Sequence, residues 1–110
     1  MALSLVENFK GYNFAYWKIT DFTADINAKI INVRIALYKD RSARIDNPDN
    51  YVKKELKTIK VQDIDISNNL LAELYIAIKK EHLSSNYNEN GDVIGTYNSN
   101  KFTSAEDIID

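Results

Sequence analysis

Apolar and polar positions alternate most regularly in residues 29–39 of this chain. Four apolar residues recur there at every second position: Ile31, Val33, Ile35 and Leu37. A period of two is typical of a strand with one face in a hydrophobic core. The preceding residues 12–24 are rich in aromatic and β-branched residues and predict a second strand, with Trp17 and Ile19 on one face and Phe22 on the other. The polar break at residues 25–27 suits a turn, so we expect a hairpin.

A third strand is predicted over residues 51–66, although its alternation is interrupted. Its apolar residues fall into two sets of opposite parity: Val52 with Leu56, and Ile59 with Val61. A bulge near residues 57–58 would bring all four side chains to one side of the sheet. Lysine on an edge strand discourages edge-to-edge aggregation, so we expect an exposed or edge face for most of the lysines in this segment: Lys53, Lys54, Lys57 and Lys60.

One amphipathic helix is predicted over residues 68–81. Ser67 is a suitable N-cap, and the apolar residues after it form one stripe: Leu70, Leu71, Leu74, Ala77 and Ile78. Residues 40–50 contain the chain's one proline and are predicted to be a loop. Beyond Leu83 the sequence becomes polar, and Asn90-Gly91 predicts the turn of a small hairpin over residues 86–97.

These elements predict an α+β fold: a small antiparallel β-sheet of three or more strands with one packed α-helix and a C-terminal hairpin. The length of 110 residues favours one sheet-plus-helix domain. Apolar residues make up 45% of the chain, which indicates an ordered globular protein. We expect an N-terminal arm at residues 1–11, a β-sheet plus helix domain at 12–83, and a C-terminal hairpin and tail extension at 84–110.

Both ends of the chain carry apolar residues that a small core cannot easily cover. They are Leu3, Leu5, Val6 and Phe9 at one end, and Phe102, Ile108 and Ile109 at the other. Exposed together, these side chains would form a larger apolar patch than soluble monomers usually have. We therefore expect these seven residues to make contacts between subunits.

Charge and composition exclude several classes of partner and chemistry. Fourteen basic and sixteen acidic residues give a net charge of −2, which does not favour nucleic acid. The absence of cysteine excludes disulfides, thiol catalysis and cysteine-rich zinc sites. No apolar run approaches the roughly 20 residues that cross a bilayer, so we expect no membrane partner. Residues 1–7 lack the features of a signal peptide, which favours synthesis in a cytoplasm.

Candidate catalytic residues are few. His82 is the one histidine, and its place after a helix end, beside Lys79 and Lys80, indicates a solvated capping residue. Asp63 and Asp65 are expected to point the same way on a strand end, but nothing in the sequence indicates the enclosed pocket that acid–base catalysis needs, which favours a solvated strand-to-helix junction. We therefore predict no catalytic residues and no enzymatic activity.

Residues 86–97 match a calcium-binding loop only in part. The matching positions are Asn86, Asn88, Asn90, Gly91 and Asp92. Neutral amides replace carboxylates there, and Tyr97 stands where a bidentate glutamate is required. We expect a turn, with no metal-binding or cofactor-binding residues. The lysines after residue 51 could form a weak phosphate-binding stripe, but in an acidic chain a solvated face is the preferred interpretation.

Four stretches of the chain share a layout with one group of proteins. They are the Met-Ala-Leu start, the strand Tyr16-Trp17-Lys18-Ile19, the strand end Ile35-Ala36-Leu37-Tyr38-Lys39-Asp40, and the helix Leu71-Ala72-Glu73-Leu74-Tyr75-Ile76-Ala77-Ile78-Lys79-Lys80. Over residues 1–82 this layout resembles small structural proteins of tailed bacteriophages and prophages, which form neck, tail or baseplate components. The resemblance implies a structural virion subunit without enzymatic activity, held in a symmetric ring or collar.

We therefore predict a structural virion subunit that assembles in a symmetric multi-subunit ring. Its partners would be other copies of the chain and other virion proteins. It would be made in the host bacterial cytoplasm and located in the virion. The alternative is a monomeric β-type binding module for carbohydrate or protein, in which exposed tyrosines contact the ligand.

Overall fold

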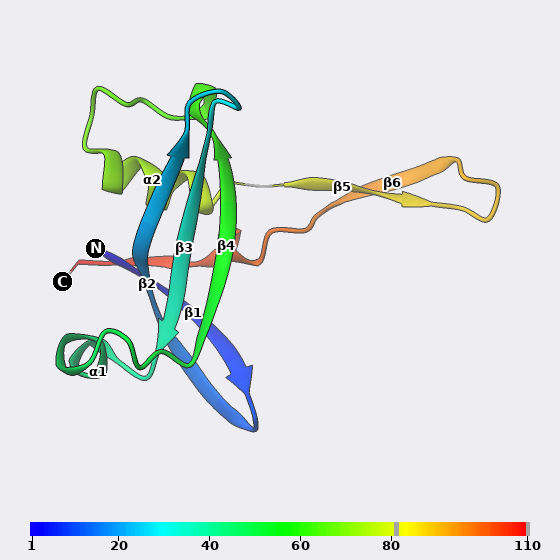
Figure 1. Ribbon diagram of the computed structural model, residues 1–110. Helices are drawn as coiled ribbons and strands as arrows, with labels where there is room; N and C mark the ends of the chain where they lie inside the picture. Colours follow the sequence, from blue (N-terminus) through cyan, green and yellow to red (C-terminus); the bar gives the residue numbers. More distant parts are fainter. Residues whose placement is uncertain (81, 110) are drawn as a thin grey trace.

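The computed structural model describes residues 1–80 and 82–109 (Figure 1). Its elements in chain order are β1 (Ala2–Phe9), β2 (Tyr12–Asp25), β3 (Ile30–Tyr38), α1 (Arg41–Asp46), β4 (Lys53–Lys60), the 3-10 helix η1 (Val61–Asp63), α2 (Leu70–Ile78), β5 (Leu83–Tyr87), β6 (Val93–Asn98), the 3-10 helix η2 (Lys101–Ser104) and β7 (Glu106–Ile108). They form a five-stranded sheet in the order β4-β3-β2-β1-β7, and a separate two-stranded sheet of β5 and β6. All strand pairs are antiparallel. The predicted α+β fold class is confirmed.

The apolar stripe of β3 forms the centre of the core, as predicted. Its four members, Ile31, Val33, Ile35 and Leu37, are buried on one face of the large sheet. Helix α2 packs on this face through Leu74, Tyr75 and Ile78 (Figure 1). Burial of aliphatic and aromatic side chains in this layer is the main stabilising contribution to the fold.

Helix α2 begins later than predicted. Asn69, not Ser67, is the N-cap: its side chain accepts a hydrogen bond from the backbone N–H of Ala72 at 3.3 Å. Ser67 instead donates to the carboxylate of Asp65 in the preceding turn. The helix ends at Ile78, and the predicted end at Glu81 lies outside the described residues.

A bulge in β2 is tied to helix α2. The pairing of β2 with β3 shifts between Ile19 and Asp21, and the backbone N–H of Ile19 donates to the Tyr75 hydroxyl at 2.8 Å. The bulge adds one residue and reverses the alternation, so Phe22 lies opposite Val33, on the core side of the sheet. The expectation that Phe22 and Trp17 lie on opposite faces is therefore wrong.

Residues 1–11 are not an arm, contrary to the prediction. Strand β1 pairs with β2 on one side and with β7 on the other. The side chain of Leu3 is fully buried, and the carbonyl of Leu5 accepts a hydrogen bond from the Trp17 indole N–H at 3.0 Å. The register shifts between Ser4 and Glu7, which interrupts the period-two pattern that would have indicated a strand.

The end of the chain returns to the large sheet. Phe102 in η2 is fully buried, and its ring meets that of Trp17 edge to face, with 5.0 Å between centroids and 84° between planes. Strand β7 pairs with the start of β1, and Ile108 packs on a small cluster on the opposite face: Ala2, Tyr16, Ala36 and Tyr38. The predicted extension at 84–110 is thus correct for the hairpin and wrong for η2, which packs on the core through Phe102, and for β7, which joins the sheet.

The predicted bulge in β4 is also wrong. Strand β4 pairs with β3 in one continuous register from Lys53 to Lys60. As a result Lys57 shares the core side of the sheet with Ile59, whereas Leu56 is exposed on the other side. The long apolar stem of lysine can cover apolar surface while its ammonium group stays at the edge, which explains charged residues on this face.

A short helix lies within the predicted loop at residues 40–50. Asp40 caps α1 by accepting a hydrogen bond from the backbone N–H of Ala43 at 2.7 Å. After the helix, the Pro48 carbonyl accepts a hydrogen bond from the Tyr38 hydroxyl at 2.6 Å. Six residues are too few for a clear helical period, so only the capping aspartate could have indicated this helix.

Candidate functional site

The β5–β6 hairpin projects from the body of the molecule (Figure 1). The radius of gyration of the chain is 15.9 Å. A compact domain of this length would have a radius of gyration of about 13 Å, so the chain is extended, and the projecting β5–β6 hairpin contributes to this. The hairpin therefore presents both of its faces to potential partners.

Large apolar side chains on this hairpin are exposed. They are Leu83, Tyr87, Val93, Ile94 and Tyr97. Tyr87 lies directly opposite Val93 in the pairing of β5 with β6, and Leu83 has the same parity along β5, so these three share one face. Tyr97 lies opposite Ser84, on the other face. An isolated two-stranded hairpin is marginally stable in water, so these side chains are better stabilised when a partner covers them.

The tip of the hairpin is a turn closed by its own polar groups. The side-chain oxygen of Asn88 accepts hydrogen bonds from the backbone N–H groups of Asn90, at 2.9 Å, and Asp92, at 3.0 Å. Gly91 has a φ of 83°, a conformation that glycine adopts without strain. The predicted turn at Asn90-Gly91 is confirmed, and the Asn88 oxygen that a calcium loop would use is engaged within this turn.

Hydrogen bonds fix the base of the hairpin to helix α2. The side-chain amide of Asn100 donates to the carbonyls of Ile78, at 2.7 Å, and Lys80, at 2.6 Å. These carbonyls lie at the end of the helix, where helical partners are lacking. Just before β5, the backbone N–H of His82 donates to the side chain of Asn98, the last residue of β6, at 3.0 Å. The direction of the hairpin is therefore set by the end of α2.

His82 and Ser99 lie close together at this base. His82 Nδ1 is 3.0 Å from Ser99 Oγ, a distance also found between nucleophile and base in hydrolases. However, the Ser99 hydroxyl donates its one hydrogen to the carbonyl of His82 at 3.1 Å. The Ser84 hydroxyl also donates to Ser99 Oγ at 2.9 Å, so Ser99 is part of a hydrogen-bonded group at the hairpin base. This geometry is that of a hydrogen-bonded hairpin base, and it was not predicted because the two residues are far apart in sequence.

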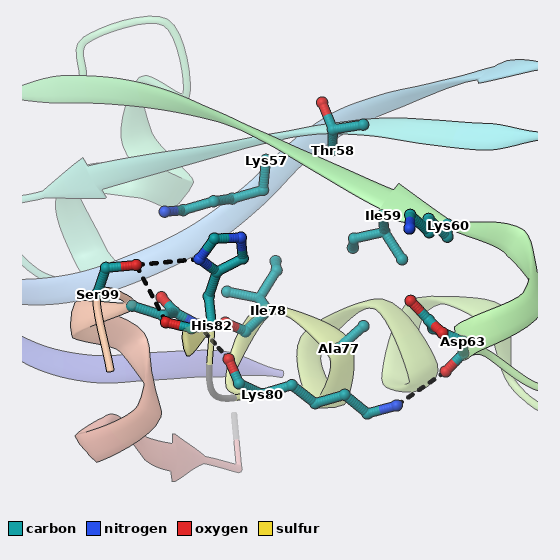
Figure 2. Close-up of a pocket in the computed structure, with 11 residues that line it drawn as sticks. Lys57, Thr58, Ile59, Lys60, Asp63, Ala77, Ile78, Lys80, His82 and Ser99 are labelled. Atoms are coloured by element: carbon teal, nitrogen blue, oxygen red, sulfur yellow. Dashed lines mark hydrogen bonds between the residues drawn. The ribbon is translucent and has the colours of Figure 1, made fainter. Parts of the chain in front are cut away.

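A groove of about 560 Å³ lies beside the hairpin base (Figure 2). It is formed by four consecutive residues of β4, by one residue of η1, by the end of α2, and by residues that lie just before β5 and just after β6. The lining includes Lys57, Thr58, Ile59 and Lys60. Because successive side chains of a strand point to opposite faces, a groove lined by all four lies along the strand's edge. In the sheet order β4 is an edge strand, so its outer backbone groups are not used by the sheet.

Positive charge predominates in this groove. Its lining has three lysines, Lys57, Lys60 and Lys80, whereas Asp63 is the one carboxylate among the described residues of the lining. The Lys80 ammonium donates to the backbone carbonyl of Asp63 at 2.9 Å, a contact drawn as a dashed line in Figure 2. Lys57 lies over the Phe102 ring at 5.0 Å from the centroid. The groove is therefore suited to an acidic ligand or segment.

A second group of charges joins β1, β4 and η2. The Glu7 carboxylate accepts hydrogen bonds from Lys53 at 2.8 Å and from Lys101 at 3.0 Å, and Lys101 also pairs with Glu55. The Lys101 ammonium lies 5.0 Å from the centre of the Trp17 ring. These contacts hold the C-terminal segment on the sheet, so we interpret the group as structural.

The environment of Glu7 makes part of the stability depend on pH. The hydrogen bond from Lys53, and then the bond and charge of Lys101, lower the pKa of Glu7 below 4.5 against the opposing effect of burial. A carboxyl group with a lowered folded-state pKa stabilises the fold above its unfolded-state pKa, and this contribution is lost as pH falls through the lowered pKa.

Glu7→Gln is therefore expected to destabilise the protein at pH 7 and much less at acid pH. We expect the free energy of unfolding to fall by about 1 kcal/mol at neutral pH. The Glu7 side chain is only 19% exposed, but its lysine partners are more exposed, and solvent weakens their interaction with Glu7. Urea unfolding of both proteins at about pH 7 and pH 3 measures the difference, which should shrink at the lower pH. An equal difference at the two pH values would contradict this role for Glu7.

The residues predicted to contact other subunits lie in different environments. Leu3 and Phe102 are fully buried in the monomer core, so this prediction is wrong for them. Leu5 and Ile108 are partly buried against the two apolar clusters, and Phe9 is half-buried. Val6 and Ile109 are exposed. Two of the seven predicted residues are thus exposed, and a larger set of exposed apolar side chains lies on the hairpin.

Asp63 and Asp65 do not form a paired site. Asp65 accepts hydrogen bonds from the backbone N–H and hydroxyl of Ser67, which lower the pKa of Asp65. Asp63 lies in η1, and its backbone carbonyl contacts Lys80. Each carboxylate thus has a separate local setting.

In the described ranges 1–80 and 82–109, no group of three or more acidic or histidine side chains is arranged to hold a metal ion. Over the same residues, none of the helices combines the length and apolar character of a membrane span. No protein-family model, curated protein or solved structure matches this chain.

Proposed function

We propose that this chain is a structural subunit of a tailed bacteriophage particle, part of its neck, tail or baseplate, and that several copies form a symmetric ring. The observation that carries the proposal is the projecting β5–β6 hairpin, whose large apolar side chains are exposed. Contact with a neighbouring subunit would bury these side chains and stabilise both the hairpin and the assembly. Small subunits that assemble in closed rings share such interfaces.

The assignment to a phage particle rests on the resemblance of residues 1–82 to small virion proteins. The strand Tyr16-Trp17-Lys18-Ile19 and the helix around Leu74 carry this resemblance, and they are elements of one sheet-plus-helix body. The packed sheet-plus-helix body and the projecting hairpin suit a protein that connects neighbours. The proposal includes no enzymatic step, which is supported by the local bonding of Ser99: its hydroxyl contacts the carbonyl of His82 and accepts a hydrogen bond from Ser84.

A monomeric binding module for carbohydrate or protein is the second candidate. It is favoured by the exposed tyrosines on the hairpin, Tyr87 and Tyr97, which lie on its two faces. Tyrosine offers a rigid contact surface with a polar tip at low entropic cost. In this alternative the hairpin would contact a ligand instead of another copy of the chain.

Association with phage particles tests the first candidate. Particles from a bacterium whose phage or prophage encodes the chain would be banded in a density gradient, and their peptides quantified by mass spectrometry. We expect the chain to band with the particles in a constant ratio to the major virion proteins. An abundant host enzyme measures carry-over as the control. A chain that remains in the lysate, with no more than the carry-over in the particle band, would exclude a virion subunit.

A further inference from the structure

We propose that the β5–β6 hairpin of one copy docks along the edge strand β4 and the adjoining basic groove of the next copy. This inference rests on the proposed assembly and specifies its interface. The contact joins two different surfaces of the chain, so it is head-to-tail and generates a ring when the rotation closes. The occupant of the groove is thus a second copy of this protein.

The charges of the two surfaces are opposite. The hairpin has two charged residues, Glu89 and Asp92, both acidic and both next to its turn. From residue 83 to residue 100 the sequence has no lysine, arginine or histidine. The groove, in contrast, has Lys57, Lys60 and Lys80 in its lining. Opposite potentials on two patches steer their encounter and fix their relative orientation.

The backbone at the two surfaces is also complementary. Strand β4 is at the edge of the large sheet, and β5 and β6 form a two-stranded sheet whose outer edges are not paired within it. A strand added at an exposed sheet edge gains a row of backbone hydrogen bonds. The hairpin can therefore extend the neighbouring sheet while its acidic turn reaches the lysines at the end of β4.

Lysines along β4 also select between possible partners. Lys54, Lys57 and Lys60 of one copy would repel the same lysines of another copy, so two β4 edges do not pair with each other. An acidic hairpin meets no such repulsion. The same side chains thus oppose edge-to-edge aggregation and favour the head-to-tail contact, a combination typical of specific interfaces.

Charge reversal at each surface tests this interface. The hairpin variant combines Glu89→Lys with Asp92→Lys, and the groove variant combines Lys60→Glu with Lys80→Glu; all four side chains are exposed. Sedimentation velocity of the full-length chain measures the assembly. We expect each variant alone to weaken association about tenfold or more. An equimolar mixture should assemble again, because each reversed surface then meets its complement.

Matched controls separate the interface from general charge effects. The control variant combines Lys10→Glu with Lys39→Glu, at exposed positions outside the groove. It changes the net charge by the same amount as the groove variant, and it should assemble like the unmodified chain. Thermal melts show whether each variant keeps its fold. Raising the salt concentration should weaken the unmodified assembly, since exposed charge pairs are screened.

Three results would overturn the inference, and they differ from one another. If hairpins paired with hairpins, the groove variant would assemble normally. If both charge-reversed variants assembled normally, the interface would lie elsewhere while the proposed assembly remained, leaving the groove to a different partner. If the unmodified chain stayed monomeric at every concentration, both the interface and the proposed ring would be excluded.

Discussion

Phe102→Ala is expected to lower the free energy of unfolding by about 3–5 kcal/mol, the usual cost of removing a buried phenylalanine side chain. Phe102 is fully buried, and its ring makes an edge-to-face contact with Trp17. The substitution would leave a cavity in the core and would remove the surface over which Lys57 lies. Because η2 and β7 follow each other, the loss of Phe102 would also weaken the pairing of β7 with β1.

Urea unfolding followed by tryptophan fluorescence measures this change, since Trp17 is the one tryptophan of the chain. Phe22→Ala is the matched control, because the Phe22 side chain is 43% exposed. We expect Phe22→Ala to lower the free energy of unfolding by clearly less than Phe102→Ala does. Equal losses for the two variants, or a loss at Phe102 below about 1 kcal/mol, would show that the C-terminal segment is not part of the core.

Leu74→Ala is expected to cost about 2–5 kcal/mol, because it opens a cavity between the helix and the sheet. Leu74 is fully buried and belongs to the cluster that contains Ile35 and Leu37. The substitution shortens a side chain on the face of α2 that packs against the sheet. Since the base of the hairpin is fixed to the end of α2, a loosened helix would also free the direction of the hairpin.

Leu71→Ala provides the control within the same helix. Leu71 is 38% exposed and its substitution has the same effect on helix propensity, so the difference between the variants isolates the packing contribution. Urea melts of the two proteins should differ by more than about 1 kcal/mol. A Leu74 loss below about 0.5 kcal/mol would show that the helix does not pack on the sheet.

The regular elements were predictable because a periodic pattern spans enough residues. The alternation in β3 identified the core face, and the stripe through Leu74 and Ile78 identified the helix that covers it. Asn90-Gly91 identified the turn of the hairpin, because glycine readily adopts the positive φ found there. Each of these signals is local in sequence and is repeated or chemically specific.

The missed elements have interrupted or short patterns. A bulge breaks the alternation in β1 and separates Leu3 from the residues after it. Strand β7 has three residues, which is too short for a period to appear. In β4 the core side carries Glu55 and Lys57, whose neighbours in space are Lys101 and Phe102 from the other end of the chain. Contacts between residues so far apart in the sequence produce no pattern that can be recognised within one segment.

The candidate site was only partly predictable for the same reason. The sequence predicted uncovered apolar residues and a lysine-bearing edge strand. It did not predict where these two features lie relative to each other in the fold. The groove combines β4, the end of α2 and the hairpin base, so it exists only in the folded chain (Figure 2). The exposed apolar side chains of the hairpin, such as Tyr87 and Val93, stand out only once the rest of the fold is seen not to cover them.

The mass of the full-length chain in solution tests most directly the proposal that the hairpin makes contacts between copies. Sedimentation velocity would be measured from about 1 to 100 μM, which covers dissociation constants in the micromolar range. The proposal predicts a discrete species whose mass is a whole-number multiple of the 12.6 kDa chain and whose population rises with concentration. A single species at 12.6 kDa over the whole range would contradict the proposed ring and favour the monomeric binding module.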